Sequence, residues 1–459
     1  MIPDYTAMDA QVSANNRFSY SQEFLRGLVK DALDHASRCG ASAAEADASE
    51  GFGHSVTVRL DDVETIEYNR DKDVGITVFF GQQRGHASTS DFSPAALRDT
   101  VEKAISIARH TASDPFAGLA DPALLAGPDL PDLDLYHPWA LSVEAAIDMA
   151  RRCETAALQA DARIANSEGA TVYTQESQFV YGNSLGFLGG YAGSSHGISC
   201  SVIAGTEAEM QRDYWYSTAR APRDLEPAEI VGRLAGERTA RRLKARKLKT
   251  CQAPVLFEAT LASSLIGHFV GAVSGGALYR KSSFLQDSLG RQVFSPQVCL
   301  REEPHRPKGL ASAPFDDDGV ATSARDVVAG GVVQGYFLGS YSARKLGMVS
   351  TGNAGGNHNL VLSPFGGGFG DLLRQMGRGL LVTELLGHGV NAVTGDYSRG
   401  AAGFWVEGGE IRYPVQEITI AGNLKDMFRN VVAVGDDIVV RGSKITGSIL
   451  VDGMTIAGD

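Results

Sequence analysis

The 459-residue sequence has few cysteines and prolines and no long apolar segment. None of its cysteines forms a C-x-x-C pair; the five are Cys39, Cys153, Cys200, Cys251 and Cys299. Their odd number and irregular spacing favour free thiols in a reducing compartment over a disulfide framework. The N-terminus lacks the basic and apolar regions of a signal peptide, and no apolar run reaches the roughly 18 residues of a membrane span. We therefore expect a soluble, cytoplasmic protein that does not contact membranes.

Positive charge is also scarce. The formal net charge is −12, which argues against direct binding to nucleic acid because a phosphate backbone repels an acidic protein. One basic stripe follows several acidic residues in a predicted helix over 225–249; its members are Arg238, Arg241, Arg242, Lys244, Arg246, Lys247 and Lys249. Acidic residues early and basic residues late match the helix dipole. We interpret this stripe as a solvated helix face.

Glycine, in contrast, is abundant. The chain has 53 glycines against 16 prolines, a balance typical of tight turns and bulges between strands. Changes in pattern predict a flexible arm over 1–17, an N-terminal α+β domain over 18–140, a middle region of helix and strand over 141–250 that continues this half, and a C-terminal β-rich domain over 251–459. The expected fold class is therefore α+β, with helices on an antiparallel sheet followed by a mostly antiparallel sandwich or barrel.

The N-terminal half alternates between helical and strand periodicity. Apolar residues at helical spacing predict helices over 21–38 and 142–160, and Ser93-Pro94 is a typical start for another helix. Between them, alternating residues predict short strands, with polar turns at Asp61-Asp62 and Asp71-Lys72. These elements indicate helices packed on a meander of strands.

The segment Leu261–Gly276 is an apolar helix where a metal-binding helix could lie. A helical metal site needs two ligands about one turn apart and a nearby carboxylate. His268 is the only histidine here, and no acidic residue lies between Glu258 and Asp287. This helix alone cannot form a two-ligand site.

Other histidines and short motifs give no recognisable site. His305, His358 and His388 stand in separate loops, and sequence does not show whether they converge. The glycine loop after residue 364 breaks the dinucleotide pattern, because Leu373 occupies the third glycine position. No G-x-S-x-G elbow is present. The acidic run at 316–318 lacks the order of a calcium loop and predicts a tight turn.

Four strings in the C-terminal half resemble the TldD/PmbA family. They are P-F-D-D-D-G-V-A-T at 314–322, Y-S-A-R-K-L-G-M-V-S-T-G-N-A at 341–354, the run from G-L-L-V-T-E-L-L-G-H-G-V to G-F-W-V-E-G-G-E-I at 379–411, and Y-P-V-Q-E-I-T-I-A-G-N-L at 413–424. The N-terminal half fits more loosely, so the resemblance covers nearly the whole chain.

The resemblance implies a peptidase family with two branches that pair. The TldD-like branch carries H-E-x-x-x-H and a later cysteine, and is understood as the zinc-bearing subunit. Alignment on the shared Arg280-Lys281 turn puts that motif at Gly267, His268 and Ala272, so all three motif positions are replaced. The last cysteine is Cys299, so the later ligand is also absent. The chain therefore resembles the PmbA/TldE branch, a non-metal partner; zinc is expected on a TldD-like subunit.

This resemblance further implies cytoplasmic proteolysis of unfolded or short peptides inside a closed cavity, including antibiotic-peptide precursors and antitoxin-type proteins. No catalytic residue, metal or cofactor is expected in this chain itself. The residues expected to line the cavity and bind peptide are His268, Tyr279, Arg280 and Lys281, together with Asp396, Tyr397 and Ser398.

Two alternatives stay open. The chain could be an independent metal-dependent hydrolase whose ligands come from loops. It could instead be a non-enzymatic protein that binds DNA gyrase or another partner, since the family also carries the label of gyrase modulator. In isolation a symmetric homodimer is expected on general grounds.

Overall fold

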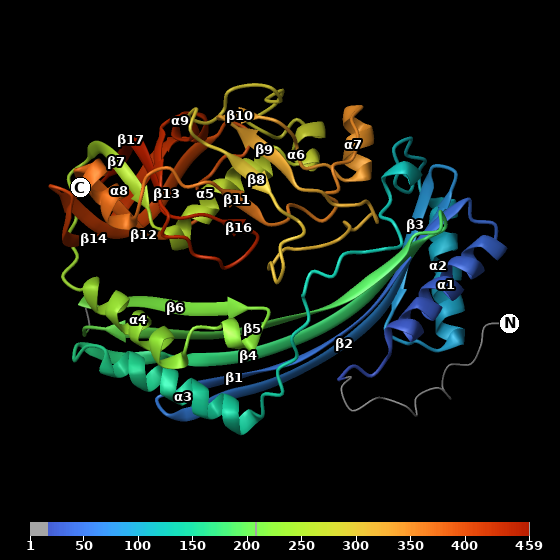
Figure 1. Cartoon of the computed structure of the whole chain (residues 1–459), viewed down its shortest axis with the longest axis horizontal. Helices are drawn as coiled ribbons and strands as arrows, with labels where there is room; N and C mark the ends of the chain where they lie inside the picture. The colour runs from blue at the N-terminus through green and yellow to red at the C-terminus, as the bar shows by residue number, and fades with distance from the viewer. Residues whose placement is uncertain (1–16, 207–208, 459) are drawn as a thin grey trace.

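The computed structural model describes residues 17–206 and 209–458 (Figure 1). The predicted flexible arm falls on residues 1–16, outside the described ranges, except for Arg17. The N-terminal half forms a six-stranded sheet in the order β3-β2-β1-β4-β5-β6, with every neighbouring pair antiparallel. Its strands are β1 Ala43–Arg59, β2 Asp62–Phe80, β3 Gln83–Thr89, β4 Ile164–Asn183, β5 Leu188–Ala204 and β6 Gln211–Ala219.

These strands are longer than predicted, and the turn expected at Asp71-Lys72 is wrong. Both residues lie inside β2, paired with Gly51 and Glu50 of β1. The first ten residues of β2 are exposed, and its core-facing part begins only beyond them. The polar residues in this exposed part do not end the strand. They continue the pairing with β1 beyond the core. The turn expected at Asp61-Asp62 lies one residue earlier, at Leu60-Asp61, and connects β1 to β2.

Four helices cover one face of the sheet, two at each end. They are α1 Gln22–Arg38, α2 Pro94–His110, α3 Val143–Gln159 and α4 Ala228–Arg241, with short 3₁₀ turns η2 Pro122–Leu124 and η4 Pro222–Asp224. The side chains of Ser21, Ser93 and Ser142 cap α1, α2 and α3, and each stands at a predicted helix start. Even-numbered residues of β1 pack under the helices. The odd-numbered ones therefore face the other way.

The C-terminal half is a β-rich body with a closed five-stranded barrel, which confirms the expected fold class. The order β14-β13-β12-β7-β17 closes through pairing of β14 with β17, and β15 extends the sheet from β17. The strands are β7 Cys251–Phe257, β12 Arg378–Leu386, β13 Asp396–Glu407, β14 Glu410–Asn423, β15 Val431–Val434 and β17 Ile449–Ala457. Only β7 and β12 pair in parallel within it.

A smaller sheet and five helices complete this half. The sheet has the order β10-β9-β8-β11-β16, with strands β8 Leu300–Glu302, β9 Arg325–Ala329, β10 Val332–Val333, β11 Leu360–Leu362 and β16 Lys444–Ile445. The helices are α5 Ala259–Ala272, α6 Gly275–Tyr279, α7 Ser340–Leu346, α8 Phe369–Met376 and α9 Leu424–Arg429. Aromatic side chains fill the centre of the core, among them Phe257, Phe269, Phe294 and Phe428.

Figure 1 shows the C-terminal half lying over the long curved sheet. Buried ion pairs join the halves, and they correct the interpretation of the basic stripe as solvated at two of its seven residues, since the other five are exposed. The Arg238 side chain is 16% exposed and donates to Glu258 at 2.8 Å, while Arg242, 10% exposed, pairs with Glu384. The helix also ends at Arg241, earlier than predicted. No helix in the described ranges combines the length and apolar character needed to cross a membrane.

Candidate functional site

The segment proposed as the site folds into two helices rather than one. Apolar residues Leu265 and Phe269 bury one face of α5, which ends at Ala272. Val273 is the C-cap of α5, and the hydroxyl of Ser274 accepts a hydrogen bond from Ala277 N at the start of α6. The predicted helix over 261–276 is thus confirmed as far as Ala272 and ends four residues earlier than predicted.

His268 projects from α5 into a small cluster with Tyr397 and Arg399 of β13. The rings of His268 and Tyr397 meet edge to face, with centroids 5.9 Å apart. Burial and the charge of Arg399 lower the pKa of His268, and burial raises the pKa of Tyr397 to about 12. Within the described residues, His268 Nε2 and Arg399 Nε are buried without a hydrogen-bond partner. The cluster thus offers N–H donors and no carboxylate.

These residues do not fit a metal ion. Gly267 and Ala272, at the other two motif positions, supply no ligand, so α5 contributes a single imidazole. The guanidinium of Arg399 places a positive charge beside it, which disfavours a cation. In the described part of the chain, no group of three His, Cys, Asp or Glu side chains could hold a metal.

The remaining residues of the predicted site take different positions. Tyr279 packs edge to face on Tyr341 at 5.9 Å, and Arg280 donates to the Tyr279 hydroxyl at 3.0 Å. Lys281 is exposed in a left-handed turn with φ 56°.

On β13, Asp396 and Ser398 are exposed while Tyr397 is buried, because alternate residues of a strand face opposite sides. Asp396 is held by Thr394 and Asn423, and these hydrogen bonds lower its pKa. The structure thus brings only Tyr397 of this string to His268. Arg399 was not among the predicted residues, although it lies two positions from Tyr397 and therefore faces the same side of β13.

A second feature, which we call the acidic cavity, lies between the sheet and the C-terminal loops. It measures about 550 Å³. Its acidic lining comes from Glu45 and Asp47 of β1 and from Asp316 and Asp317, and its aromatic wall from Phe179, Tyr181, Tyr191 and Phe315. Burial and the charge of Asp318 raise the pKa of Asp316 to about 7. Burial also raises the pKa of Glu45, Asp47 and Asp317.

The predicted acidic turn forms the upper wall of this cavity. Gly319 N donates to Asp316 O at 2.9 Å, which closes the turn. The Asp316 carboxylate accepts from the backbone N–H groups of Asp318, Val320 and Ala354. Gly355 has φ 91°, and a Cβ there would collide with the Asp317 carboxylate. Sequence indicated the turn but not that it meets β1.

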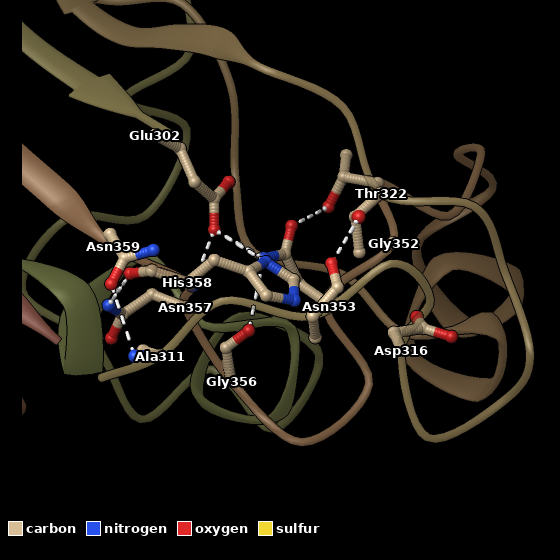
Figure 2. A network of polar contacts seen from close by, with 12 residues as sticks. Glu302, Ala311, Asp316, Thr322, Gly352, Asn353, Gly356, Asn357, His358 and Asn359 are labelled. Atoms are coloured by element: carbon tan, nitrogen blue, oxygen red, sulfur yellow. Dashed lines mark hydrogen bonds and ion pairs between the residues drawn. The ribbon is translucent and has the colours of Figure 1, made fainter. Parts of the chain in front are cut away.

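Glu302 fixes the rest of this wall, as Figure 2 shows. It is 1% exposed and accepts from Asn353 Nδ2 at 2.8 Å and from His358 N and Nδ1 at 2.8 and 3.1 Å. Its other oxygen accepts from Arg325 Nε at 2.8 Å. Burial opposes ionisation, but the His358 hydrogen bonds and the charge of Arg325 lower the pKa of Glu302.

Two of the three loop histidines therefore converge near this cavity. The charge of His358 acts on His305, whose pKa is lowered mainly by burial and whose Nε2 lies 2.9 Å from Thr322 Oγ1. His388 lies in a separate exposed loop. The pair is tied to hydrogen-bond partners and does not make a ligand set for a metal.

Comparison with known proteins covers almost the whole chain. Residues 44–108, 136–243 and 250–458 match, in order, domain 1, the central domain and the C-terminal domain of PmbA/TldA metallopeptidases. The metalloprotease PmbA of Escherichia coli O157:H7 is 51% identical over 95% of this chain and 97% of its own length. A PmbA homolog from Haemophilus influenzae is 49% identical over the same shares.

Solved structures show the same architecture. A protein described as a modulator of DNA gyrase from Bacteroides thetaiotaomicron has a TM-score of 0.89 and 28% identity, covering 94% of this chain and 98% of its own. TldE from Thermococcus kodakarensis has a TM-score of 0.82 and 19% identity, covering 94% of this chain and 100% of its own, a likeness that speaks for the fold alone.

Proposed function

Since the chain belongs to the PmbA/TldA metallopeptidase family, we propose that it is the peptide-binding, metal-free subunit of a two-chain peptidase. Its partner is a TldD-like chain that carries zinc. The substrates are unfolded or short peptides, of the kind found in antibiotic-peptide precursors and antitoxins.

The observation that carries this proposal is the cluster on α5. Where a metal helix would present two imidazoles and a carboxylate, this helix presents Gly267, His268 and Ala272, with Arg399 beside them. Because burial lowers the pKa of His268, its imidazole is neutral near pH 7 and can donate or accept a single hydrogen bond. Such groups suit a peptide carbonyl or carboxylate, and they have no means of activating water by metal coordination.

The test is peptide hydrolysis by the full chain alone and together with a TldD-like chain. Cleavage is expected only when both are present, with zinc found by elemental analysis on the partner. Metal-dependent cleavage by this chain alone would overturn the proposal in favour of an independent hydrolase. Capture of a gyrase subunit in place of a TldD-like chain would favour the non-enzymatic alternative.

A matched pair of variants locates the site within the complex. His268→Phe, which keeps a ring but has no hydrogen-bonding atom, is expected to lower kcat/KM by about tenfold, the effect of losing one hydrogen bond of roughly 1.4 kcal/mol. Ser398→Ala, on the opposite side of β13, is the control and leaves kcat/KM unchanged. Equal effects from the two variants would exclude the α5 cluster as a peptide-binding site.

A further inference from the structure

A third feature, which is rich in basic residues, lies at the end of the sheet away from the acidic cavity. Two adjoining cavities of about 370 and 250 Å³ share Tyr216, Val439 and Arg441. Together they form a groove between β6 and the loop 438–444, which we call the β6 groove. Figure 1 shows this loop, in red before β16, descending towards β6.

β6 is an edge strand along this groove, and of its outward backbone groups the Tyr216 carbonyl is already bonded to Arg441. In the sheet order β6 comes last and pairs only with β5. The carbonyl oxygens of Arg212 and Tyr216 point away from β5, since they accept from side chains of Arg242 and Arg441 at 2.9 and 2.8 Å. Backbone groups of an edge strand alternate in direction. The backbone N–H and C=O of Thr218, two residues beyond Tyr216 and in the groove lining, therefore also point away from β5.

The groove contains three cations that make no ion pair with the described residues, Arg220, Arg441 and Lys444, beside the carboxylates of Asp224 and Glu226. Lys308 pairs with Asp224 at 3.0 Å, but Arg220 donates only to backbone carbonyls, those of Ser194, Gly309 and Leu310. Arg441 lies over the rings of Trp215 and Tyr216 at 4.1 and 3.9 Å.

Lys444 is half-buried, and the contact made by its Nζ is Ser443 Oγ at 3.3 Å. Across the described ranges, no carboxylate lies within ion-pair distance of Arg220, Arg441 or Lys444. Burial alone lowers the pKa of Lys444. A half-buried cation without an anion has lost part of its hydration, so binding of an anion at this site would be favourable.

The groove ends against α5. Ala259, Thr260 and Ser263 on the first turns of the helix line the smaller cavity together with Arg441 and Lys444. Further along, a Cβ at Gly267 would lie 3.7 Å from Cε of Lys444. A chain running along β6 therefore meets a helix at this point, where a chain end fits better than a continuing chain.

We propose that the β6 groove binds the C-terminal part of an extended peptide, with its backbone on the β6 edge and its terminal carboxylate between Arg441 and Lys444. The inference rests on the proposed peptide-binding function and names a substrate feature for it. Strand addition supplies backbone hydrogen bonds that any sequence can make, and the two cations select the free carboxylate.

The experiment measures binding of fluorescent peptides to the isolated full-length chain by anisotropy. One peptide of about eight residues, close to a usual strand length, is compared in its free-acid and C-terminally amidated forms. The free acid is expected to bind about tenfold more tightly, and added salt is expected to remove the difference because it screens the carboxylate. Equal affinity of the two forms would overturn the proposal. So would affinity that follows the number of Glu residues inside the peptide and not its C-terminal carboxylate.

Variants assign the effect to Lys444. Lys444→Met is expected to weaken the free acid about tenfold and leave the amide unchanged, whereas Lys425→Met, at an exposed position of α9, changes neither. A loss of equal size for acid and amide would refute the role of Lys444. If Lys444→Met does not fold, the salt titration of the native chain still decides between acid and amide.

The outcomes separate this inference from the proposed function. Cleavage by the two-chain complex without any acid preference would reject the groove assignment alone. An acid preference in a chain that never pairs with a TldD-like subunit would reject the proposed function and keep the groove.

Discussion

The acidic cavity and the β6 groove lie between the same two halves of the molecule, yet they treat charge in opposite ways. In the acidic cavity two of the four lining carboxylates, Asp316 and Glu45, have hydrogen-bond partners within the chain. Asp316 accepts three backbone N–H groups and Glu45 accepts the Tyr181 hydroxyl. In the β6 groove Arg441 and Lys444 have no carboxylate at ion-pair distance in the described residues. The acidic cavity is therefore an internal contact between the halves, whereas the β6 groove contains cations that make no ion pair with the rest of the described chain.

This difference shows where a ligand adds most free energy. A charge already held by internal hydrogen bonds gains little from an external partner, whereas an unpaired, partly buried cation gains a charge-assisted bond. The net charge of −12 hides this contrast, because it averages an acidic end with a locally basic one. Three changes probe the comparison, beginning with the buried ion pair of Glu302 behind the acidic cavity.

The largest effect is expected from Glu302→Gln. Removing this charge leaves Arg325 without its ion pair and removes one acceptor from the Asn353 and His358 network. Breaking a buried ion pair in this way is expected to lower the free energy of unfolding by about 3–5 kcal/mol. Urea unfolding of the isolated chain measures the loss.

The matched control is Asp326→Asn, which removes the partner of Arg301 in an exposed ion pair on the same small sheet. That loss is expected to be below about 1 kcal/mol. Similar losses for the two variants would mean that the wall of the acidic cavity is not held by Glu302.

The pH dependence of stability is the second probe. Because the folded-state pKa of Asp316 is raised to about 7, the folded chain keeps a proton that the unfolded chain loses between about pH 4 and pH 7. The contribution of this group to stability is therefore present at low pH and falls as pH rises, by at most about 1.4 kcal/mol per pH unit.

Asp318→Asn tests this sign, since the charge of Asp318 helps to raise the pKa of Glu45, Asp316 and Asp317. Relative to the native chain, the variant is expected to gain stability as pH rises from about 5 to about 8. Urea unfolding across this range measures the difference, and Asp326→Asn should run parallel to the native curve. A constant difference between Asp318→Asn and the native chain would contradict the electrostatic coupling.

What sequence could predict follows the range of the interactions concerned. The cap Ser93 depends on a residue three positions away and was predicted, and Ser21 and Ser142 stand at the predicted starts of their helices. The false turn at Asp71-Lys72 depends on pairing with β1, which no local pattern reveals. The barrel was expected as one of two β architectures, whereas its closure by β14 and β17 is a tertiary event.

The candidate sites divide in the same way. The family resemblance located α5 and its replaced motif, and the period of β13 could have added Arg399 to Tyr397. The acidic cavity could not be foreseen, because Asp47, Tyr191, Asp316 and His358 come from segments far apart in the chain. The buried pairs of Arg238 and Arg242 were taken for a solvated face because their partners lie in the other half.

The smallest effect is expected at the basic end, from Arg441→Lys. Lysine keeps the charge but not the planar guanidinium that lies over Trp215 and Tyr216 and donates to the Tyr216 carbonyl. The expected loss in the free energy of unfolding is about 1 kcal/mol, measured by urea unfolding. Arg246→Lys is the control, since Arg246 lies over one ring, Tyr413, at 4.7 Å, and should lose less. If Arg441→Lys does not lower the free energy of unfolding, stacking on the two rings does not stabilise this cation in the absence of a counter-ion. The contrast between the two ends then reduces to the sign of their charge.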